Sequence, residues 1–171
     1  MPDFLALITN KKYWFFHSWV IKNILKIYGI RVGKNFYIEG IPKLKLRGNP
    51  LNISIGDNVS IFGDIDIRNR ENGKIMIDDG VSIDNDCRLV SANDAVLKIG
   101  KRTSIGPFCV FNCGTDVTIG EDCLISGMIF IQSSQHGFNK GSLIKAGKFA
   151  GISVYGDVWA MSVCTLAPVT V

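Results

Sequence analysis

Histidine is scarce in this sequence, and neither paired cysteines nor long hydrophobic runs are present. The 171 residues include two histidines and five cysteines, an odd number that argues against a disulfide framework. The absence of a Cys-x-x-Cys pair argues against a structural zinc site. No apolar run reaches the ~20 residues that span a bilayer, and the start of the chain lacks a secretory signal. We therefore expect a cytoplasmic protein that requires no metal.

Acidic residues are few in the first 50 positions, where two Asp/Glu accompany nine Lys/Arg. Residues 51–171 hold thirteen acidic and ten basic side chains, so a basic N-terminal segment precedes a mildly acidic body. Such asymmetry can indicate an anionic surface as partner, or simply a solvated helix face. The hydrophobic share of 47% argues against disorder, and we expect no nucleic-acid partner.

An internal repeat dominates the middle of the sequence. Its starts lie 22, 22 and 20 residues apart, in the segments Ile55–Val59, Ile77–Val81, Ile99–Thr103 and Ile119–Cys123. Inside each repeat a second aliphatic residue follows the first after six positions, as Ile61 follows Ile55. A six-residue step fits neither the 3.6-residue period of a helix nor the alternation of a single strand. It predicts short strands separated by bends, with three steps closing a triangular coil.

A small or β-branched residue stands four positions after the aliphatic one, where only a small side chain fits inside a corner. The residues at this position are Val59, Val81, Cys87, Thr103, Cys109 and Cys123. Gly, Asp and Asn gather between them, where bends and positive φ angles are cheapest. Stacked coils would bury the aliphatic columns and hydrogen-bond to one another. The inward cysteines are expected to act as small apolar side chains.

This repeat resembles that of the hexapeptide-repeat acyltransferases, over residues 53–171. The resemblance implies a mainly β fold, a left-handed parallel β-helix, and a homotrimeric assembly. The hexads break at about 132–153, which predicts a loop inserted there. Residues 31–52 are expected to form an irregular first coil, and residues 1–30 a helical segment.

The N-terminal segment has apolar residues at helical spacing over residues 4–30, with a cap or break at Thr9-Asn10 and a stop at Gly29. Two interpretations stay open. The helix could pack on the β-helix or on a neighbouring subunit, as aromatic stripes usually do. It could instead lie on a membrane surface as a peripheral contact near a lipid-linked acceptor.

The second histidine, His136, lies in Ser133-Ser134-Gln135-His136-Gly137-Phe138, at the start of the predicted loop. This segment resembles the catalytic histidine segment of the sugar and polysaccharide O-acetyltransferases in the family. Imidazole titrates near neutral pH and can take a proton from a hydroxyl group. The resemblance implies that His136 is the general base, that acetyl-CoA is the acetyl donor, and that a saccharide is the acceptor. The basic aromatic N-terminus fits a lipid-linked or nucleotide-linked form of this saccharide.

Two further segments carry the resemblance. Phe111-Asn112-Cys113 resembles the segment whose Asn lines the acceptor pocket, so Asn112 would orient the acceptor, and nearby Asp116 would bind a sugar hydroxyl. Both are also common turn residues. Gly156–Trp159 resembles a Gly-x-x-Val-Trp stretch, which implies that Trp159 lies along the CoA groove near the backbone of Ala160 and Ser162. A subunit-interface role for Trp159 is the alternative.

The expected function is acetyl-CoA-dependent O-acetylation of a sugar or polysaccharide precursor. One alternative is N-acetylation of an amino sugar nucleotide by the same base. Another is a non-catalytic β-helix scaffold, because relatives have further coils where this sequence stops. A β-helical carbonic anhydrase is rejected, because it needs three histidine ligands for zinc and the sequence has two histidines.

Overall fold

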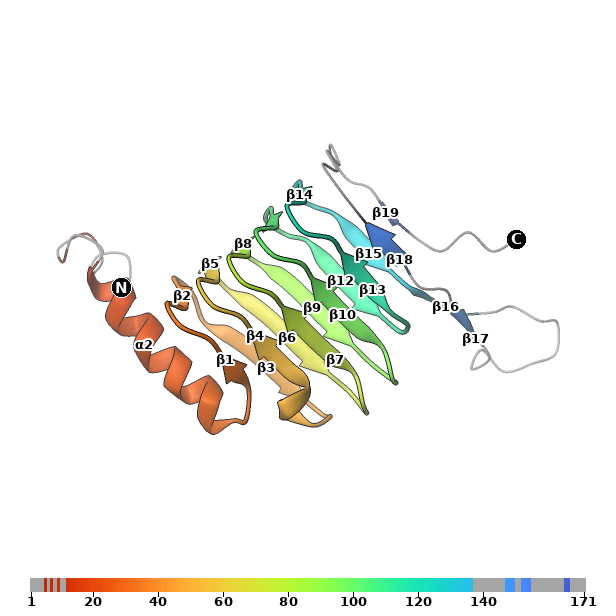
Figure 1. Ribbon diagram of the computed structural model, residues 1–171, viewed down its shortest axis with the longest axis horizontal. Coiled ribbons are helices and arrows are strands. Elements are labelled where there is room, and N and C mark those ends of the chain that lie inside the picture. Colours follow the sequence, from red (N-terminus) through yellow and green to blue (C-terminus); the bar gives the residue numbers. More distant parts are fainter. Residues whose placement is uncertain are drawn as a thin grey trace.

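The computed structural model describes Leu5, Leu7, Thr9 and residues 12–136, 147–149, 152–154 and 165–166, with side chains described as far as residue 133. One α-helix, α2 (Lys12–Ile27), precedes a stack of short parallel strands. The strands wind into a three-sided solenoid, and α2 lies across its N-terminal end (Figure 1). The predicted mainly β fold of stacked coils with an N-terminal helix is confirmed.

Each of the first five coils gives one strand to each of three parallel sheets, and among the described residues the first and third sheets gain one further strand. The first sheet contains β1 (Arg31–Val32), β4 (Ile53–Ile55), β7 (Lys74–Ile77), β10 (Val96–Ile99), β13 (Val117–Ile119) and β18 (Ile152–Val154). The second contains β2 (Tyr37–Ile38), β5 (Ser60–Phe62), β8 (Ser82–Asp84), β11 (Ser104–Ile105) and β14 (Leu124–Ile125). The third contains β3 (Pro42–Leu46), β6 (Ile65–Asn69), β9 (Cys87–Ser91), β12 (Val110–Cys113), β15 (Phe130–Gln132) and β19 (Thr165–Leu166).

The six-residue spacing sets the register of this stack. Ile55 pairs with Ile77, and Ile77 with Ile99, so the first aliphatic residue of each repeat forms one column inside the prism. The residues six positions later form a second column, in which Ile61 pairs with Ile83. These side chains are at most 3% exposed. A strand that faces a core on one side fixes its register in this way, because a one-residue slip would expose the whole column.

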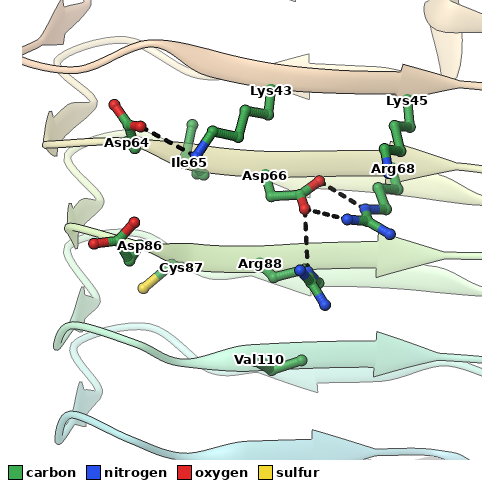
Figure 2. Close-up of a pocket in the computed structure, with 10 residues that line it drawn as sticks. All are labelled: Lys43, Lys45, Asp64, Ile65, Asp66, Arg68, Asp86, Cys87, Arg88 and Val110. Carbon is green, nitrogen blue, oxygen red and sulfur yellow. Dashed lines mark hydrogen bonds and ion pairs between the residues drawn. The ribbon is translucent and has the colours of Figure 1, made fainter.

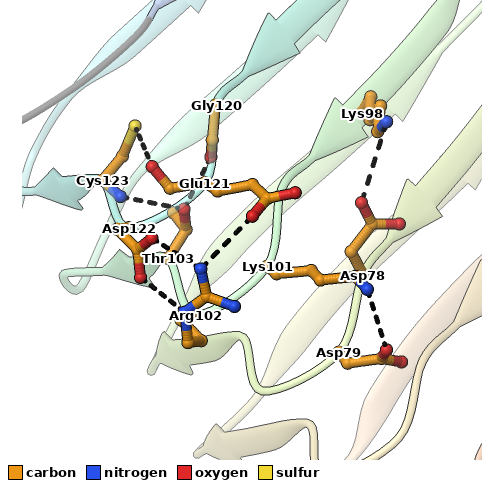
Figure 3. Close-up of polar contacts among 10 residues, drawn as sticks. All are labelled: Asp78, Asp79, Lys98, Lys101, Arg102, Thr103, Gly120, Glu121, Asp122 and Cys123. Atoms are coloured by element: carbon orange, nitrogen blue, oxygen red, sulfur yellow. Dashed lines mark hydrogen bonds and ion pairs between the residues drawn. The ribbon is translucent and has the colours of Figure 1, made fainter.

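The corners show why polar turn residues recur between the hexads. Positive φ angles recur at equivalent places in successive coils, at Asn35, Asn58, Gly80, Arg102 and Asp122. Asn, Asp and Gly adopt this left-handed conformation at the least cost. In the fourth coil, Thr103 follows the corner residue Arg102 and occupies the small inward position. Its hydroxyl donates to the carbonyl of Gly120 at 2.8 Å and accepts from the N–H of Cys123 at 3.1 Å (Figure 3).

The helix α2 packs on the first coil. Trp14, Ser18 and Leu25 face the prism and are buried, and α2 contacts β1 and β2. His17 Nε2 donates to the carbonyl of Gly40 at 3.0 Å. Residues 31–52, which were expected to be irregular, contain three strands and the short 3-10 helix Pro50–Asn52, and their strands pair in register with the second coil.

The chain leaves the prism after β15 and rejoins the first sheet at β18, where Ile152 pairs with Val117. Between them, β16 (Ser134–His136) and β17 (Gly147–Phe149) form an antiparallel pair. Both strands project from the stack in Figure 1. Residues 137–146, 150 and 151 of the loop predicted at about 132–153 lie outside the described residues.

Candidate functional site

The outward face of the third sheet carries a row of polar side chains. Strand alternation turns Leu44, Ile67 and Leu89 inward, so their neighbours point out. One outward column runs through Lys43, Asp66, Arg88, Val110 and Phe130. The parallel column runs through Lys45, Arg68, Val90, Asn112 and Gln132. The predicted acceptor residue Asn112 therefore shares a sheet face with four cationic side chains from the coils before it.

A groove of about 500 Å³ lies along this face at its N-terminal half. Its polar lining comes from three neighbouring strands and the corners before them, as Figure 2 shows. The lining includes Lys43, Lys45, Asp64, Asp66, Arg68, Asp86 and Arg88. Four cations against three carboxylates give the groove a mixed polar surface with an excess of hydrogen-bond donors. Such a surface suits a ligand rich in hydroxyl or anionic groups.

Asp66 joins two of these cations. Its Oδ1 accepts a hydrogen bond from Arg68 Nε at 2.7 Å, and its Oδ2 accepts one from Arg88 Nε at 3.1 Å. The hydrogen bond from Arg68 is the main cause that lowers the pKa of Asp66 below its usual value. Lys43 is paired with Asp64 at 3.2 Å. Among the described residues Lys45 forms no ion pair, so its ammonium group is the cation most available to a ligand.

The loop that carries His136 is rooted beside Asn112. The backbone N–H of Ser133 donates to the carbonyl of Asn112 at 3.2 Å. The buried Ser133 hydroxyl donates to the carbonyl of Thr115 at 2.7 Å and accepts from the N–H groups of Gly114 and Thr115, both at 3.2 Å. Thr115 Oγ1 in turn donates to the carbonyl of Ser133 at 3.2 Å. This network fixes where the chain leaves the prism.

His136 follows Ser133 by three residues and ends β16, where its backbone pairs with Gly147. An extended chain rises about 3.3 Å per residue, so the backbone of His136 lies within roughly 15 Å of that of Asn112. The structure therefore brings the root of the predicted catalytic segment and the predicted acceptor residue to one corner. The imidazole of His136 lies outside the described side chains.

The other predicted site residues either form a turn contact or lie outside the described part of the chain. Asp116 is exposed, and its Oδ1 accepts from the N–H of Val96 at 2.8 Å, which is a turn-stabilising contact between two coils. Trp159, Ala160 and Ser162, predicted to bind acetyl-CoA, lie outside the described residues.

Sequence reasoning missed the cations of the groove. Their signal was present, because Lys43-Leu44-Lys45 and Asp66-Ile67-Arg68 alternate polar and apolar residues as half-buried strands do. What the sequence does not give directly is that the two segments lie side by side. That follows only once the 23-residue step between Lys43 and Asp66 is assigned to one coil.

Other polar side chains link adjacent coils of the solenoid. Arg102 reaches Asp122 and Glu121 of the next coil, with hydrogen bonds of 2.6 and 3.2 Å, and Lys98 reaches Asp78 at 3.8 Å (Figure 3). These pairs are solvent-exposed links between adjacent coils and contribute little each. The four described cysteines are buried and unpaired. Burial raises the pKa of Cys113 to about 12, so its thiol stays protonated at neutral pH.

Within the described part of the chain, no three His, Cys, Asp or Glu side chains lie close enough together to hold a metal ion. The helices of the described residues include none that is long and apolar enough to cross a membrane.

No family model matches the chain, and no curated protein sequence matches it. Among solved structures the chain is similar to the "Crystal Structure of the polySia specific acetyltransferase NeuO", at 20% sequence identity and a TM-score of 0.32. The match covers 74% of this chain and 60% of that one, so the chain spans less than two thirds of that structure's length. The repeat and the three-sheet prism, taken together, show that the fold is a three-sided β-solenoid whose strands follow six-residue steps of the sequence.

Proposed function

We propose that this protein is an acetyl-CoA-dependent O-acetyltransferase, with a saccharide hydroxyl as acceptor and His136 as general base. One observation carries the proposal: the segment that bears His136 is rooted by Ser133 directly beside Asn112, on a sheet face that continues into a polar groove. A saccharide lying along the groove would present a hydroxyl group at the corner where His136 follows.

The chemistry needs few groups. The imidazole of His136 would take the proton of the acceptor hydroxyl as the oxygen attacks the thioester carbonyl. A C–O bond forms, and the C–S bond breaks when the tetrahedral intermediate collapses. The imidazolium then returns the proton to the leaving thiolate of CoA. Asn112 would hold a neighbouring hydroxyl group, and backbone N–H groups of the loop would stabilise the oxyanion.

The groove would hold the rest of the acceptor. Its spare donor, Lys45, lies in the same outward column as Asn112 and three strands away from it. At a strand spacing of about 4.8 Å, that separation is roughly 14 Å, the length of two to three sugar units. We infer a homotrimer for the assembly, in which Trp159, Ala160 and Ser162 complete the acetyl-CoA site.

The test is acetyl transfer from radiolabelled acetyl-CoA to a panel of saccharides, with hydroxyl and amine acceptors compared. We expect transfer to a hydroxyl, and His136→Ala should lower kcat by about 10²–10⁴-fold. The matched control is His17→Gln in the other histidine, which should keep normal kcat. Undiminished transfer by His136→Ala would remove the base role. Transfer to amines alone would favour an N-acetyltransferase, and no acetyl-CoA binding by calorimetry would favour a scaffold.

A further inference from the structure

The face of α2 that points away from the prism exposes several large apolar side chains. Phe16, Trp19 and Ile27 are 65%, 62% and 85% exposed, although Trp14, Ser18 and Leu25 already supply the face that packs on the first coil. The rings of Phe16 and Trp19 stack on each other with centroids 6.1 Å apart. Folded proteins seldom leave neighbouring aromatic side chains in water unless they contact a partner or a membrane.

The same end of the molecule is strongly basic. The helix α2 has three lysines, Lys12, Lys22 and Lys26, and no acidic residue. Residues 12–50, which make up α2 and the first coil, contain eight Lys/Arg and one acid, Glu39, whose Oε1 accepts a hydrogen bond from Tyr37. The acidic residues of the chain concentrate in the later coils. The exposed aromatic face therefore lies in a positive field.

An apolar slot opens between α2 and β3. Its volume is about 620 Å³, and its lining is Ile21, Ile24, Tyr28, Ile41, Pro42, Leu44, Leu46 and Pro50. The slot exists because α2 packs against β1 and β2, so the inward residues of β3 lack a cover. Leu44 is half-buried, whereas its partner Ile67 in the next coil is 1% exposed.

We propose that the α2 end of the solenoid docks on an anionic lipid bilayer, with Phe16, Trp19 and Ile27 in the headgroup region and a lipid acyl chain in the slot. Three observations meet at this end: exposed aromatic rings, unbalanced lysines and an uncharged slot. Interfacial helices combine Trp and Phe with Lys in this manner, and each Lys near an anionic surface adds attraction. A second copy of the chain fits this surface poorly, because a two-fold contact would place the lysines of α2 against those of its partner.

The test uses the full chain and vesicles, and needs no acetyl transfer. We expect sedimentation with vesicles of 70% phosphatidylcholine and 30% phosphatidylserine, and binding at least tenfold weaker to pure phosphatidylcholine. Phe16→Ser/Trp19→Ser should weaken binding to the anionic vesicles at least tenfold. Lys22→Gln/Lys26→Gln should weaken it and reduce its salt dependence. Phe108→Asn, which alters an exposed aromatic in a later coil, should bind normally.

A further variant tests the slot. Ile41 lies at its rim and is 61% exposed, so Ile41→Glu should fold normally, as circular dichroism would verify, yet bind anionic vesicles at least tenfold more weakly. Vesicle binding unchanged by Ile41→Glu would overturn the acyl-chain role. Equal binding of wild type and Phe16→Ser/Trp19→Ser, or no vesicle binding by wild type, would overturn the docking. Self-association in light scattering that Phe16→Ser/Trp19→Ser abolishes would assign the surface to a second copy instead.

Discussion

The hydroxyl group of Ser18 in α2 accepts a hydrogen bond from the backbone N–H of Ile38 in β2 at 2.8 Å, and it also lies 3.1 Å from the Ile38 carbonyl. β2 is the edge strand of the second sheet. An unprotected edge offers unpaired N–H and C=O groups to other chains. Ser18 is 2% exposed, so the contact is shielded from water. The helix thus ends the stack of coils by occupying part of the hydrogen-bonding edge that another coil would use.

Ser18→Ala should destabilise the fold by about 1–3 kcal/mol, because it leaves the buried N–H of Ile38 without an acceptor. Urea unfolding followed by circular dichroism measures the change. The matched control is Asn23→Ala, whose side chain donates only to the carbonyl of Trp19 in its own helix and is exposed. That variant should unfold within about 0.5 kcal/mol of wild type. Equal effects of the two variants would mean that the edge contact contributes nothing specific.

Phe108→Asn should stabilise the protein by about 0.5–1 kcal/mol, because Phe108 has a φ of 60° at a corner and is 48% exposed. Asn tolerates this left-handed conformation better, and little buried apolar area is lost. Phe62→Asn is the control: Phe62 has similar exposure, 46%, but lies in β5, where its ring meets that of Tyr37 at 6.1 Å. It should destabilise. Thermal unfolding of both variants tests the prediction, and a lower melting temperature for Phe108→Asn than for wild type would contradict it.

The corners also show how far sequence alone reaches. The hexads predicted the buried columns, because register and burial both follow from the six-residue step. Phe108 and Met128 adopt positive φ angles although neither residue type favours that conformation, since the coil geometry imposes it on whichever residue stands there. The first coil lacks the pattern of small inward residues, because Phe36 occupies that position. At this end of the prism, α2 rather than another coil lies on one side. Propensity rules apply to single segments, whereas these exceptions arise from the packing of one coil on the next.

The candidate site also combines residues that local motifs predict with features that depend on the stacking of coils. His136 and Asn112 could be proposed from local motifs, yet their closeness depends on the 20-residue step that pairs Gln132 with Asn112 and so places Ser133 beside it. The groove needed three coils at once, since Lys45, Arg68 and Arg88 are far apart in sequence. The slot beside α2 could not be predicted from the sequence, because it depends on how the helix packs on the first coil.

Asp66→Asn should lower stability at pH 7 by about 1 kcal/mol and lose that difference in acid. The hydrogen bond from Arg68 lowers the pKa of Asp66, so the folded state holds the carboxylate more strongly than the unfolded state does. The stabilisation is therefore present above the unfolded pKa of about 3.9 and disappears as the pH falls through the lower folded value. Unfolding free energies of wild type and variant should differ at pH 7 and should approach each other only as the pH falls below about 3.9.

Asp122→Asn provides the comparison for that series. Hydrogen bonding to Arg102 lowers the pKa of Asp122 as well, but its side chain is 61% exposed and its pairing is screened by solvent. Asn also accepts the φ of 55° at this corner. The variant should follow the wild-type pH curve closely. A larger effect at Asp122 than at Asp66 would contradict the view that partial burial gives the Asp66 pair its weight.

Ser133→Ala should reduce kcat by about 10–100-fold while leaving the general base in place, because the hydroxyl group fixes the root of the His136 loop rather than touching substrate. Its three hydrogen bonds to Gly114 and Thr115 would be lost. The pH profile of kcat/KM should keep the ionisation assigned to His136, whereas His136→Ala should remove it. Ser104→Ala, which breaks a 2.9 Å contact with Ser82 on the second sheet, serves as the control. If Ser133→Ala loses only stability and keeps its kcat, the loop root does not position the base.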